Sequence, residues 1–462
     1  MLDLLVKNGL TYIDGVFKKC DVAVKDGKIA CVAECGMLNE AKRVIDAEGK
    51  YVIPGGIDTH MHIRSPGHDD RETFYTGTMS AAQGGCTTIL EHPISTPPQY
   101  NKEILDNRKR IAKDGCVVDY AFYGAAGGEF PEEITKLAEE GIVAYKSFLH
   151  QAPEGRDKEF KGLTMANDAE IMVGMREIAK TGLMMASHAE NNDLITYNIA
   201  KMRAEGHTAP LDHCKSRPAI TEYSTVSKLI MFAKETGCVL ELAHMSTVES
   251  MELAKKAKFE GQKVFVETCP HYLLLDETTL EKHGPFARCN PPLRPRETVE
   301  KLWDYVNDGT IDFIGSDHGP FLMSEKEQGN EDIFKAYCGG PGVDTRLPLM
   351  LDAAARGKTT IERVVELLCV NPARCFNIFP QKGTISAGAD ADLVIFDMND
   401  TMTIDRNKSY SKARETARIF DGWELKCKLN YTVVRGRVLM EDGVVDENSQ
   451  GWGELVKPNG KN

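Results

Sequence analysis

Two histidines, His60 and His62, stand at the end of an apolar segment with the sequence IDTHMHI. Residues two apart in an extended strand point to the same face, so the two imidazole rings would lie side by side. Neutral imidazole nitrogen is a common ligand of zinc and other transition metals. The pair therefore indicates a metal-binding position, although a His-x-His pair by itself also arises by chance.

Four further polar residues of suitable type lie within or directly after apolar runs. His188 follows MMAS, His244 follows LELA and Asp317 follows FIGS, whereas Lys146 lies inside IVAYKSF. A buried lysine must pair, lose its proton or be modified, because an unpaired buried ammonium is costly. One hypothesis is a neutral amine that captures carbon dioxide and becomes a carbamate, an anionic bridging ligand. The alternative is a lysine that extends to the mouth of the fold.

The apolar runs that carry these residues alternate with amphipathic helical segments, which is typical of βαβ units and a parallel sheet. Eight such units predict a closed (β/α)₈ TIM barrel over about residues 52–380, with its active-site groups at the carboxyl ends of the strands. The helices expected between the runs include Asp168–Lys180, Thr225–Thr236, Thr247–Phe259 and Arg296–Asn307. The eight runs are Tyr51–Ile57, Thr87–Leu90, Val117–Tyr123, Ile142–Phe148, Leu183–Ala186, Val239–Ala243, Val264–Val266 and Ile311–Ile314.

Both ends of the chain have a different sequence pattern from the barrel region, with short runs of alternating apolar and polar residues separated by turn residues. Asn8-Gly9 and Asp26-Gly27 are strong signals for tight β-hairpin turns. After Gln381 a similar pattern returns in KGTISAGADADLVIFD and YTVVRGRVLMEDG. We therefore expect residues 1–51 and 381–462 to form one small β-sandwich domain beside the barrel.

Composition excludes several other classes of protein. The chain has 462 residues, 42% of them hydrophobic, and a formal net charge of −13, which argues against a nucleic-acid or anionic-membrane partner. No run of about 18 apolar residues predicts a membrane span. The opening MLDLLVKNGLTYIDG does not resemble a secretory signal, and 13 cysteines without a C-x-x-C pair suggest reduced thiols in the cytoplasm.

Taken together, the motifs of this chain resemble the amidohydrolase superfamily, in the cyclic-amidase branch of allantoinases, hydantoinases, dihydropyrimidinases and dihydroorotases. The resemblance spans nearly the whole chain. It is carried by PGGIDTHMHI, AAQGGCTTIL, YKSFL, HAEN, AHMST, VETCPHYLLLDE, CNPPLR, GSDHGP and KGTISAGADADLVIFD.

The resemblance implies a site with two divalent metal ions, usually zinc, and a role for each polar residue at the strand ends. His60, His62 and Asp317 would hold the more buried ion, and His188 and His244 the other. Lys146, carboxylated on its Nζ, would bridge both together with a hydroxide. Asp317 would accept the proton of the attacking hydroxide and pass it to the departing ring nitrogen.

The resemblance points to allantoinase, which opens the ring of allantoin, through stretches such as VDYAFYGAAGG and CNPPLRPRET. Two positions depart from the allantoinase pattern: Arg64-Ser65-Pro66-Gly67 replaces the usual Asn-Glu-Pro-Gly, and Gly319 replaces a common serine. In dihydroorotases an arginine at the place of Arg64 binds the substrate carboxylate, whereas the alternative here is a loop salt bridge with an acid in the segment 69–72. Further substrate contacts would come from Gln151, Asn290, Cys338 and Gly339, where hydantoinases carry a tyrosine at the position of Gln151 and an asparagine at that of Cys338.

Two other functions stay open at this point. One is a hydantoinase, dihydropyrimidinase or dihydroorotase-like enzyme with an altered pocket, and the other is a non-catalytic relative that serves as an assembly scaffold. His271 and His318 are expected to support ligands, and His92 to line the rim. Relatives of this kind are commonly homotetramers, so the resemblance also implies self-association.

Overall fold

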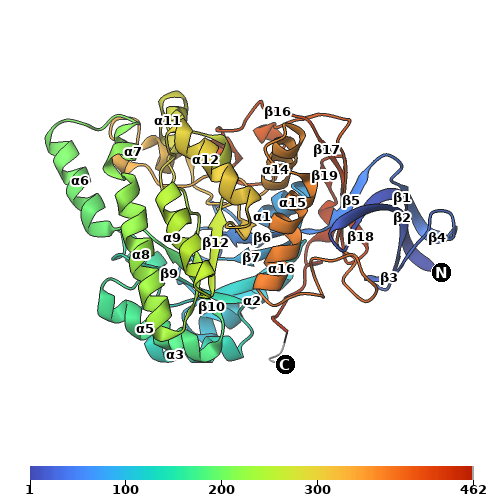
Figure 1. The fold of residues 1–462 in the computed structure, drawn as a ribbon, viewed down its shortest axis with the longest axis horizontal. Helices are drawn as coiled ribbons and strands as arrows, with labels where there is room; N and C mark the ends of the chain where they lie inside the picture. The colour runs from blue at the N-terminus through green and yellow to red at the C-terminus, as the bar shows by residue number, and fades with distance from the viewer. Residues whose placement is uncertain (154, 460–462) are drawn as a thin grey trace.

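The structure, a computed structural model, describes residues 1–153 and 155–459 and places a parallel barrel beside a mixed sheet (Figure 1). The eight barrel strands pair in the order of the chain, and all the pairs are parallel. This confirms the predicted TIM barrel. The strands are β6 (Gly56–Met61), β7 (Cys86–Glu91), β8 (Asp119–Ala125), β9 (Ala144–Phe148), β10 (Met184–His188), β11 (Val239–Leu242), β12 (Val264–Thr268) and β13 (Phe313–Ile314).

The first and last barrel strands meet through the loops at their carboxyl ends. The backbone N–H of His62 donates to the carbonyl of His318 at 2.9 Å, and the N–H of Ser316 donates to Asp58 Oδ1 at 2.9 Å. These bonds join the segment after β13 to β6. The ring of strands therefore closes at the edge where the predicted ligands lie.

Helices cover the outside of the barrel (Figure 1). The four predicted helices are present as α5, α8, α9 and α12, with ends that differ by at most a few residues except at the start of α8. The helices are α1 (Phe74–Gln83), α2 (Lys102–Gly115), α3 (Pro131–Glu139), α4 (Asp157–Phe160), α5 (Asp168–Thr181), α6 (Asn192–Ala204), α7 (Asp212–Ser216), α8 (Ala219–Thr236), α9 (Val248–Phe259), α10 (Pro270–Leu274), α11 (Thr278–His283), α12 (Arg296–Asn307), α13 (Met323–Glu327), α14 (Arg346–Ala355), α15 (Ile361–Val365) and α16 (Asn371–Cys375).

Capping residues explain where these helices begin and end. The Asn167 side chain accepts from the N–H of Glu170 at the start of α5, and Gly182 ends the helix with a left-handed φ of 75°. Thr247 caps α9 in the same way, through the N–H of Ser250. The periodic pattern and these caps agree, which is why the sequence predicted both helices closely.

Both ends of the chain contribute to one nine-stranded sheet beside the barrel. Strand β1 pairs in parallel with β4 and β5, and the remaining pairs are antiparallel. The sheet is continuous through hydrogen bonds and encloses a separate core that includes Leu4, Val22, Val52 and Ile395. Its strands are β1 (Leu2–Ile13), β2 (Val16–Lys25), β3 (Lys28–Ala33), β4 (Ala41–Asp46), β5 (Tyr51–Pro54), β14 (Leu393–Asp397), β17 (Lys428–Val434), β18 (Arg437–Glu441) and β19 (Val444–Val445), and β15 (Met402–Thr403) pairs with β16 (Glu424–Leu425) apart from it.

Two local expectations were wrong. Asn8-Gly9 is not a hairpin turn: it lies inside β1, where the register with β2 shifts, and Asn8 takes a positive φ of 63° as a β-bulge residue can. The run Tyr51–Ile57 is not one strand, because β5 joins the mixed sheet and β6 begins the barrel. Gly55 separates them, and a side chain there would overlap Thr87. Asp26-Gly27 does form the predicted turn, with φ values of 52° and 77°.

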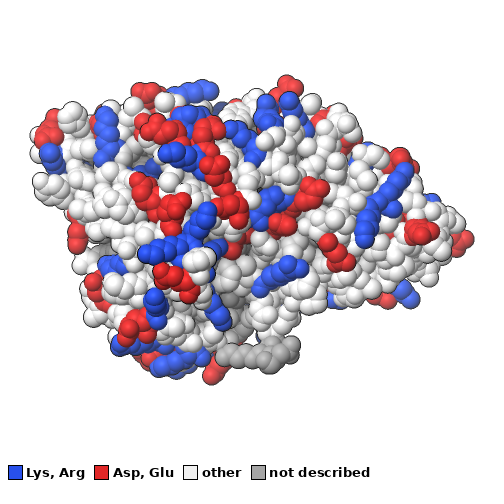
Figure 2. All heavy atoms as spheres, viewed as in Figure 1, with Lys and Arg blue, Asp and Glu red and all other residues white. Residues whose placement is uncertain are grey.

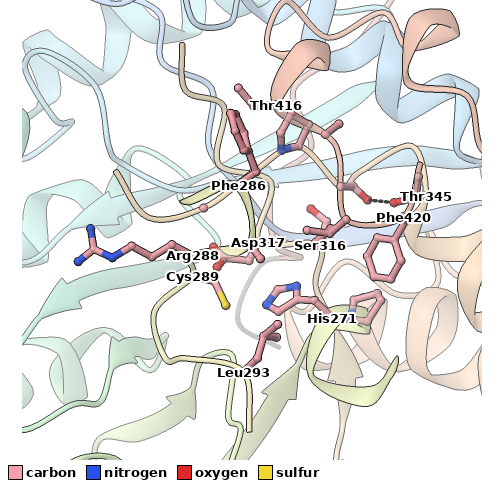
Figure 3. Close-up of a pocket in the computed structure, with 18 residues that line it drawn as sticks. His271, Phe286, Arg288, Cys289, Leu293, Ser316, Asp317, Thr345, Thr416 and Phe420 are labelled. Atoms are coloured by element: carbon pink, nitrogen blue, oxygen red, sulfur yellow. Dashed lines mark hydrogen bonds between the residues drawn. The ribbon is translucent and has the colours of Figure 1, made fainter. Parts of the chain in front are cut away.

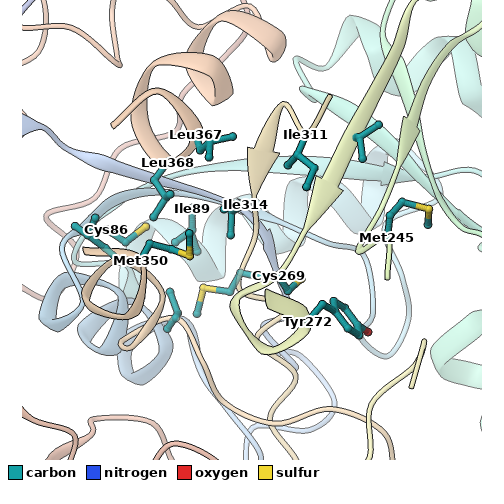
Figure 4. Close-up of a cluster of buried hydrophobic side chains, with 14 of the residues drawn as sticks. Cys86, Ile89, Met245, Cys269, Tyr272, Ile311, Ile314, Met350, Leu367 and Leu368 are labelled. Atoms are coloured by element: carbon teal, nitrogen blue, oxygen red, sulfur yellow. The ribbon is translucent and has the colours of Figure 1, made fainter. Parts of the chain in front are cut away.

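A buried apolar cluster fills the space between the barrel and the helices that follow β13 (Figure 4). Ile89 of β7 and Ile314 of β13 are fully buried there, together with Met350 of α14 and Leu367 and Leu368 after α15. This packing holds the late helices against the strands. It thereby fixes the position of the strand-end loops.

An ionic cluster joins the barrel to the mixed sheet. The ammonium of Lys382 is buried among Asp392, at 2.7 Å, Asp390, at 2.9 Å, and Asp119 at the start of β8. Arg435 also binds Asp119, at 3.1 Å. One ammonium thus links three carboxylates from the two parts of the chain. The cluster lies at the amino end of β8, away from the carboxyl ends of the strands where the predicted ligands lie.

Acidic and basic side chains are interspersed on the face of the molecule in Figure 2. This agrees with the mixed charge of the sequence, and no basic stripe appears on that face. Of the helices in the described ranges, none combines the length and the apolar character that crossing a membrane requires.

Candidate metal centre

The predicted ligands and substrate contacts converge on one cavity of about 700 Å³. It opens at the carboxyl ends of the barrel strands, where active sites of this fold lie. Strands far apart in the sequence therefore deliver their side chains to one place. The cavity is lined by all of the predicted residues: His60, His62, Arg64, Lys146, Gln151, His188, His244, Asn290, Asp317, Cys338 and Gly339.

The first group of candidate ligands consists of His60, His62 and Asp317. Asp317 Oδ1 lies 3.4 Å from His60 Nε2 and 3.5 Å from His62 Nε2. Burial, together with nearby positive charge, lowers the pKa of both imidazoles well below the ordinary value, so both rings are neutral. Burial raises the pKa of Asp317 to about 7, and a bound cation would lower it and favour the carboxylate.

The second group is the pair His188 and His244. His188 Nδ1 and His244 Nε2 lie 3.1 Å apart, so two ring nitrogens from β10 and from the loop after β11 face each other. His244 and Asp317 both adopt left-handed backbone conformations, with φ values of 44° and 50°. Such strain in a non-glycine residue costs about 1–3 kcal/mol and is concentrated at functional sites.

Lys146 lines the same cavity from the middle of β9 and is fully buried. Its Nζ has no hydrogen-bond partner among the described residues and lies 5.2 Å from the centroid of the Phe148 ring. Burial lowers its pKa from the ordinary value. A buried amine without a partner is the arrangement that a bound group or a covalent modification would satisfy.

The spacing of these atoms fits metal coordination. Nitrogen ligands about 2.0–2.1 Å from a tetrahedral zinc ion lie about 3.3 Å from one another. Three of the four pairs within the two groups, His60–Asp317, His62–Asp317 and His188–His244, are separated by 3.4, 3.5 and 3.1 Å. Neutral imidazoles and a carboxylate are also the ligand types that zinc prefers, so the residues present fit a metal pair.

Glu267, at the end of β12, supports the first group, and the sequence analysis missed its role. Its Oε2 lies 2.7 Å from His60 Nδ1 and accepts from the N–H of His244 at 3.1 Å, and its Oε1 accepts from the Thr59 hydroxyl at 2.7 Å. A carboxylate on the far nitrogen fixes the orientation and tautomer of a ligating histidine. Burial raises the pKa of Glu267 to about 7, although these hydrogen bonds oppose that shift.

Glu190 supports the second group in the same manner. Its Oε2 lies 2.9 Å from His188 Nε2, which leaves His188 Nδ1 directed at His244. Arg217 forms an ion pair with the same carboxylate. Burial raises the pKa of Glu190, but Arg217 and His188 outweigh burial and hold it at about 2.

Three other histidines lie next to the centre. His92 does not line the large cavity: it is buried behind His60, with ring centroids 3.8 Å apart and its Nε2 3.0 Å from the carbonyl of Thr59. His60, His62 and His92 form a buried group whose ring nitrogens lie within 4.8 Å of one another. His318 lies 3.3 Å from Glu72 and accepts from the N–H of Gly342, so it supports the Asp317 loop.

His271 lies at a second cavity of about 40 Å³, next to Asp317 and Ser316 (Figure 3). Burial lowers its pKa to about 3, so its ring is neutral. Its Nε2 is buried and has no hydrogen-bond partner in the described parts of the chain. His271 is therefore a neighbour of Asp317 and does not line the large cavity.

Arg64 is buried and makes no ion pair with Asp69, Asp70 or Glu72 within the described residues, so the predicted alternative of a loop salt bridge was wrong. Glu72 instead bonds to Ser411 and His318. The Arg64 guanidinium lies over the ring of Phe321, 4.7 Å from its centroid, and its Nε and Nη1 have no partner there. A Cβ at Gly319 would lie 3.8 Å from Arg64 Nη2. The two departures from the allantoinase pattern are therefore neighbours.

The remaining predicted contacts line the same cavity as Arg64. Asn290 Oδ1 is buried without a partner among the described residues, whereas Gln151 is exposed and Cys338 half-buried. The N–H of Gly339 donates to the carbonyl of Arg288 at 2.9 Å, and its carbonyl accepts from Lys326 at 2.9 Å. Gly339 thus shapes the wall, and its backbone polar groups are engaged within it.

Residues 51–439 match the amidohydrolase family. The chain belongs to this family. An L-hydantoinase of Paenarthrobacter aurescens is 36% identical over 99% of this chain and 98% of the relative. An allantoinase of Rubrobacter xylanophilus is 35% identical over 99% and 98% of the two chains.

A solved structure agrees with these relatives. The L-hydantoinase (dihydropyrimidinase) from Arthrobacter aurescens superposes with a TM-score of 0.94 at 35% identity, over 99% of this chain and 100% of that chain. The predictions of an amidohydrolase of the cyclic-amidase branch, and of a hydrolase acting on C–N bonds in cyclic amides, are therefore confirmed.

Proposed function

We propose that this enzyme opens the ring of a cyclic ureide by hydrolysis of an amide C–N bond, with allantoin as the first candidate substrate. The observation that carries this proposal is the convergence of four imidazoles, Lys146 and Asp317 on one cavity. Allantoinases and hydantoinases among the full-length relatives support the choice of ring.

We assign His60, His62 and Asp317 to one divalent ion, and His188 and His244 to a second. Lys146, if carboxylated, would bind both ions, because a carbamate would supply the negative charge and the acceptor atoms that its buried position lacks. Zinc is the metal that suits this ligand set. When bound, the two ions lower the pKa of water so that hydroxide forms near neutral pH, and they polarise the amide carbonyl.

Asp317 carries the proton in this scheme. Its carboxylate accepts the proton of the hydroxide as the oxygen attacks the amide carbon, and it delivers that proton to the ring nitrogen as the C–N bond breaks. The products are one carboxylate and one N–H group in an opened chain. Glu267 and Glu190 keep the ligating imidazoles oriented during both steps.

Arg64 binds a negatively charged or strongly polarised oxygen of the substrate. Its buried guanidinium has unused donors and faces the cavity, and it is the type of group that binds a planar anion through two parallel hydrogen bonds. Gln151, Asn290 and Cys338 complete the polar part of the wall. Gly339 keeps the turn next to Cys338 in place.

A hydantoin with a bulky substituent is the second candidate substrate. The cavity has aromatic walls, including Phe148, Phe160 and Phe321, and its volume of about 700 Å³ exceeds what a small polar ring occupies. The similarity to an L-hydantoinase points the same way. A dihydropyrimidine or dihydroorotate-like ring is a further alternative, for which Arg64 would bind the charged group.

We also propose that the enzyme is a cytoplasmic homotetramer. All of its cysteines are free thiols, as the reducing cytoplasm would maintain them. Large apolar side chains are exposed on α6 and α8, among them Tyr197 at 67% and Met231 at 60%, as a subunit interface requires. Size measurement of the purified protein tests this assembly.

A substrate panel on zinc-loaded protein tests the proposed function. Allantoin, hydantoin, a phenyl-substituted hydantoin, dihydrouracil and dihydroorotate would be compared by kcat/KM, with metal content measured on the same sample. We expect about two metal ions per chain and the highest kcat/KM for allantoin. A metal-loaded protein that opens none of these rings would refute the proposal, and a chain that binds no metal would support the scaffold alternative.

A further inference from the structure

Lys326 is a fully buried lysine outside the metal centre whose ammonium binds only backbone carbonyls among the described residues. It belongs to α13, and its Nζ donates to Tyr337 at 2.8 Å, to Gly339 at 2.9 Å and to Arg288 at 3.4 Å. An ammonium group has three N–H donors, so all three are used. The carboxylate of the neighbouring Glu325 turns away and binds Arg71 instead.

The three carbonyls belong to two segments that form one wall of the large cavity. Arg288 precedes Cys289 and Asn290, whereas Tyr337 and Gly339 flank Cys338. The N–H of Gly339 donates to the carbonyl of Arg288, which connects the two segments directly. Lys326 is thus placed where these segments meet, behind the residues that we assign to substrate binding.

The arrangement depends on the charge and on the number of donors of the lysine. Three carbonyl dipoles that point at one position repel each other unless a cation lies between them. Without Lys326 these buried oxygens would lose hydrogen bonds that water does not replace in a closed wall. Gly339 has a φ of 119°, which only glycine adopts easily, so the turn holds a conformation that needs support.

We propose that Lys326 is a positioning residue that fixes the spacing between the 288–290 segment and the 336–340 turn and thereby sets substrate affinity. Its kinetic consequence rests on the proposed function. Its structural consequence, a turn that opens when the ammonium is removed, does not. Burial lowers the pKa of Lys326 to about 8, which is compatible with a charged side chain at neutral pH.

The experiment compares Lys326→Met with Lys258→Met in the full-length, zinc-loaded protein. Lys258 serves as the control because its Nζ also donates to a backbone carbonyl, that of Thr310 at 2.7 Å, and it does not line the cavity. Its ammonium also pairs with Asp312 at 2.5 Å, so its replacement removes a comparable number of polar contacts in the region before β13. The rate at which iodoacetamide alkylates each cysteine is measured by mass spectrometry. The exposed Cys31 and Cys35 serve as internal references.

We expect Lys326→Met to raise the alkylation rate of Cys338 about fivefold or more, because the turn opens locally, without a change at Cys31 or Cys35. For the substrate that the panel identifies, KM should rise about tenfold while kcat stays within about threefold. Lys258→Met should leave the alkylation rate of Cys338 and the KM unchanged. Lys326→Gln keeps two N–H donors and should therefore give intermediate values. It replaces Lys326→Met as the test variant if Lys326→Met does not fold.

Unchanged alkylation of Cys338 in both Lys326 variants would overturn the inference. A loss of kcat with an unchanged KM would also overturn it, because that result would place Lys326 in the chemical step. A wild-type protein that opens no ring would count against the proposed function alone. The alkylation rates would still decide the role of Lys326.

Discussion

Replacement of Glu267 by glutamine tests whether the carboxylate behind His60 holds the metal centre together. Glutamine has nearly the same shape, and its amide group can point to the Thr59 hydroxyl, which can accept as well as donate. The remaining oxygen would still accept from His60 Nδ1 and from the N–H of His244. The substitution therefore removes the negative charge and leaves the contacts in place.

The expected loss follows from this geometry. Partners of this kind contribute about 10–100-fold to metal affinity, which corresponds to about 1.4–2.7 kcal/mol. We therefore expect a competing chelator to remove zinc from Glu267→Gln at a concentration about 10–100-fold lower than the concentration that removes it from the wild-type protein. At saturating zinc, kcat should recover to a large extent, because no reacting group has been removed.

Glu241→Gln is the matched control. Glu241 is an equally buried acid on the neighbouring strand β11, but its partner is the Tyr123 hydroxyl at 3.1 Å, and no candidate ligand contacts it through a hydrogen bond in the described structure. Zinc release from Glu241→Gln should stay near the wild-type value. If Glu267→Gln releases zinc no more readily than Glu241→Gln, the reasoning about His60 is wrong.

Three further substitutions test other parts of the structure. Asp317→Asn should lower kcat by about 10²–10⁴ while the fold and much of the metal remain, and initial rates measured beside metal content would contradict the proton-transfer role if activity stays near normal. Lys146→Ala should lose zinc and regain part of its activity with added acetate or propionate. Full metal content without such acids would exclude a bridging carbamate. Lys382→Met should lower the free energy of unfolding by about 3–5 kcal/mol, because it removes the buried ammonium that Asp119, Asp390 and Asp392 share and leaves Asp392 without a cationic partner among the described residues. Urea denaturation measures this, and a loss below about 1 kcal/mol would show that the cluster does not join the two parts of the chain.

The fold and the convergence of the candidate ligands were predictable because they follow from a strong local pattern and one general rule. Short apolar runs ending in His188, His244 and Asp317 alternate with capped helices, and parallel barrels bring the carboxyl ends of their strands to one rim. Neither inference requires knowledge of a specific long-range contact. That is why both could be made from the residues.

The supporting residues were not predicted, for reasons that differ between them. Glu241 lies inside an apolar run, as Lys146 does, and Glu267 directly follows one, so the argument that a buried charge must have a partner would have found them. The same argument could not predict the surroundings of Arg64, because they are formed by Phe321 and Gly319, which lie far away in the sequence. The predicted hairpin turn at Asn8-Gly9 was wrong because an Asn-Gly pair suits a β-bulge as well as a hairpin turn.

The mixed sheet constrains the order in which the chain can fold during synthesis. Val52 of β5 pairs with Ile395 of β14, and β14 in turn pairs with β17. On the ribosome, β5 therefore remains without its β14 partner until residues 393–397 have emerged, although β1 to β5 can already pair with one another. Throughout that interval the nascent chain exposes an unpaired strand edge and apolar surface, which are the features that make incomplete chains prone to aggregate.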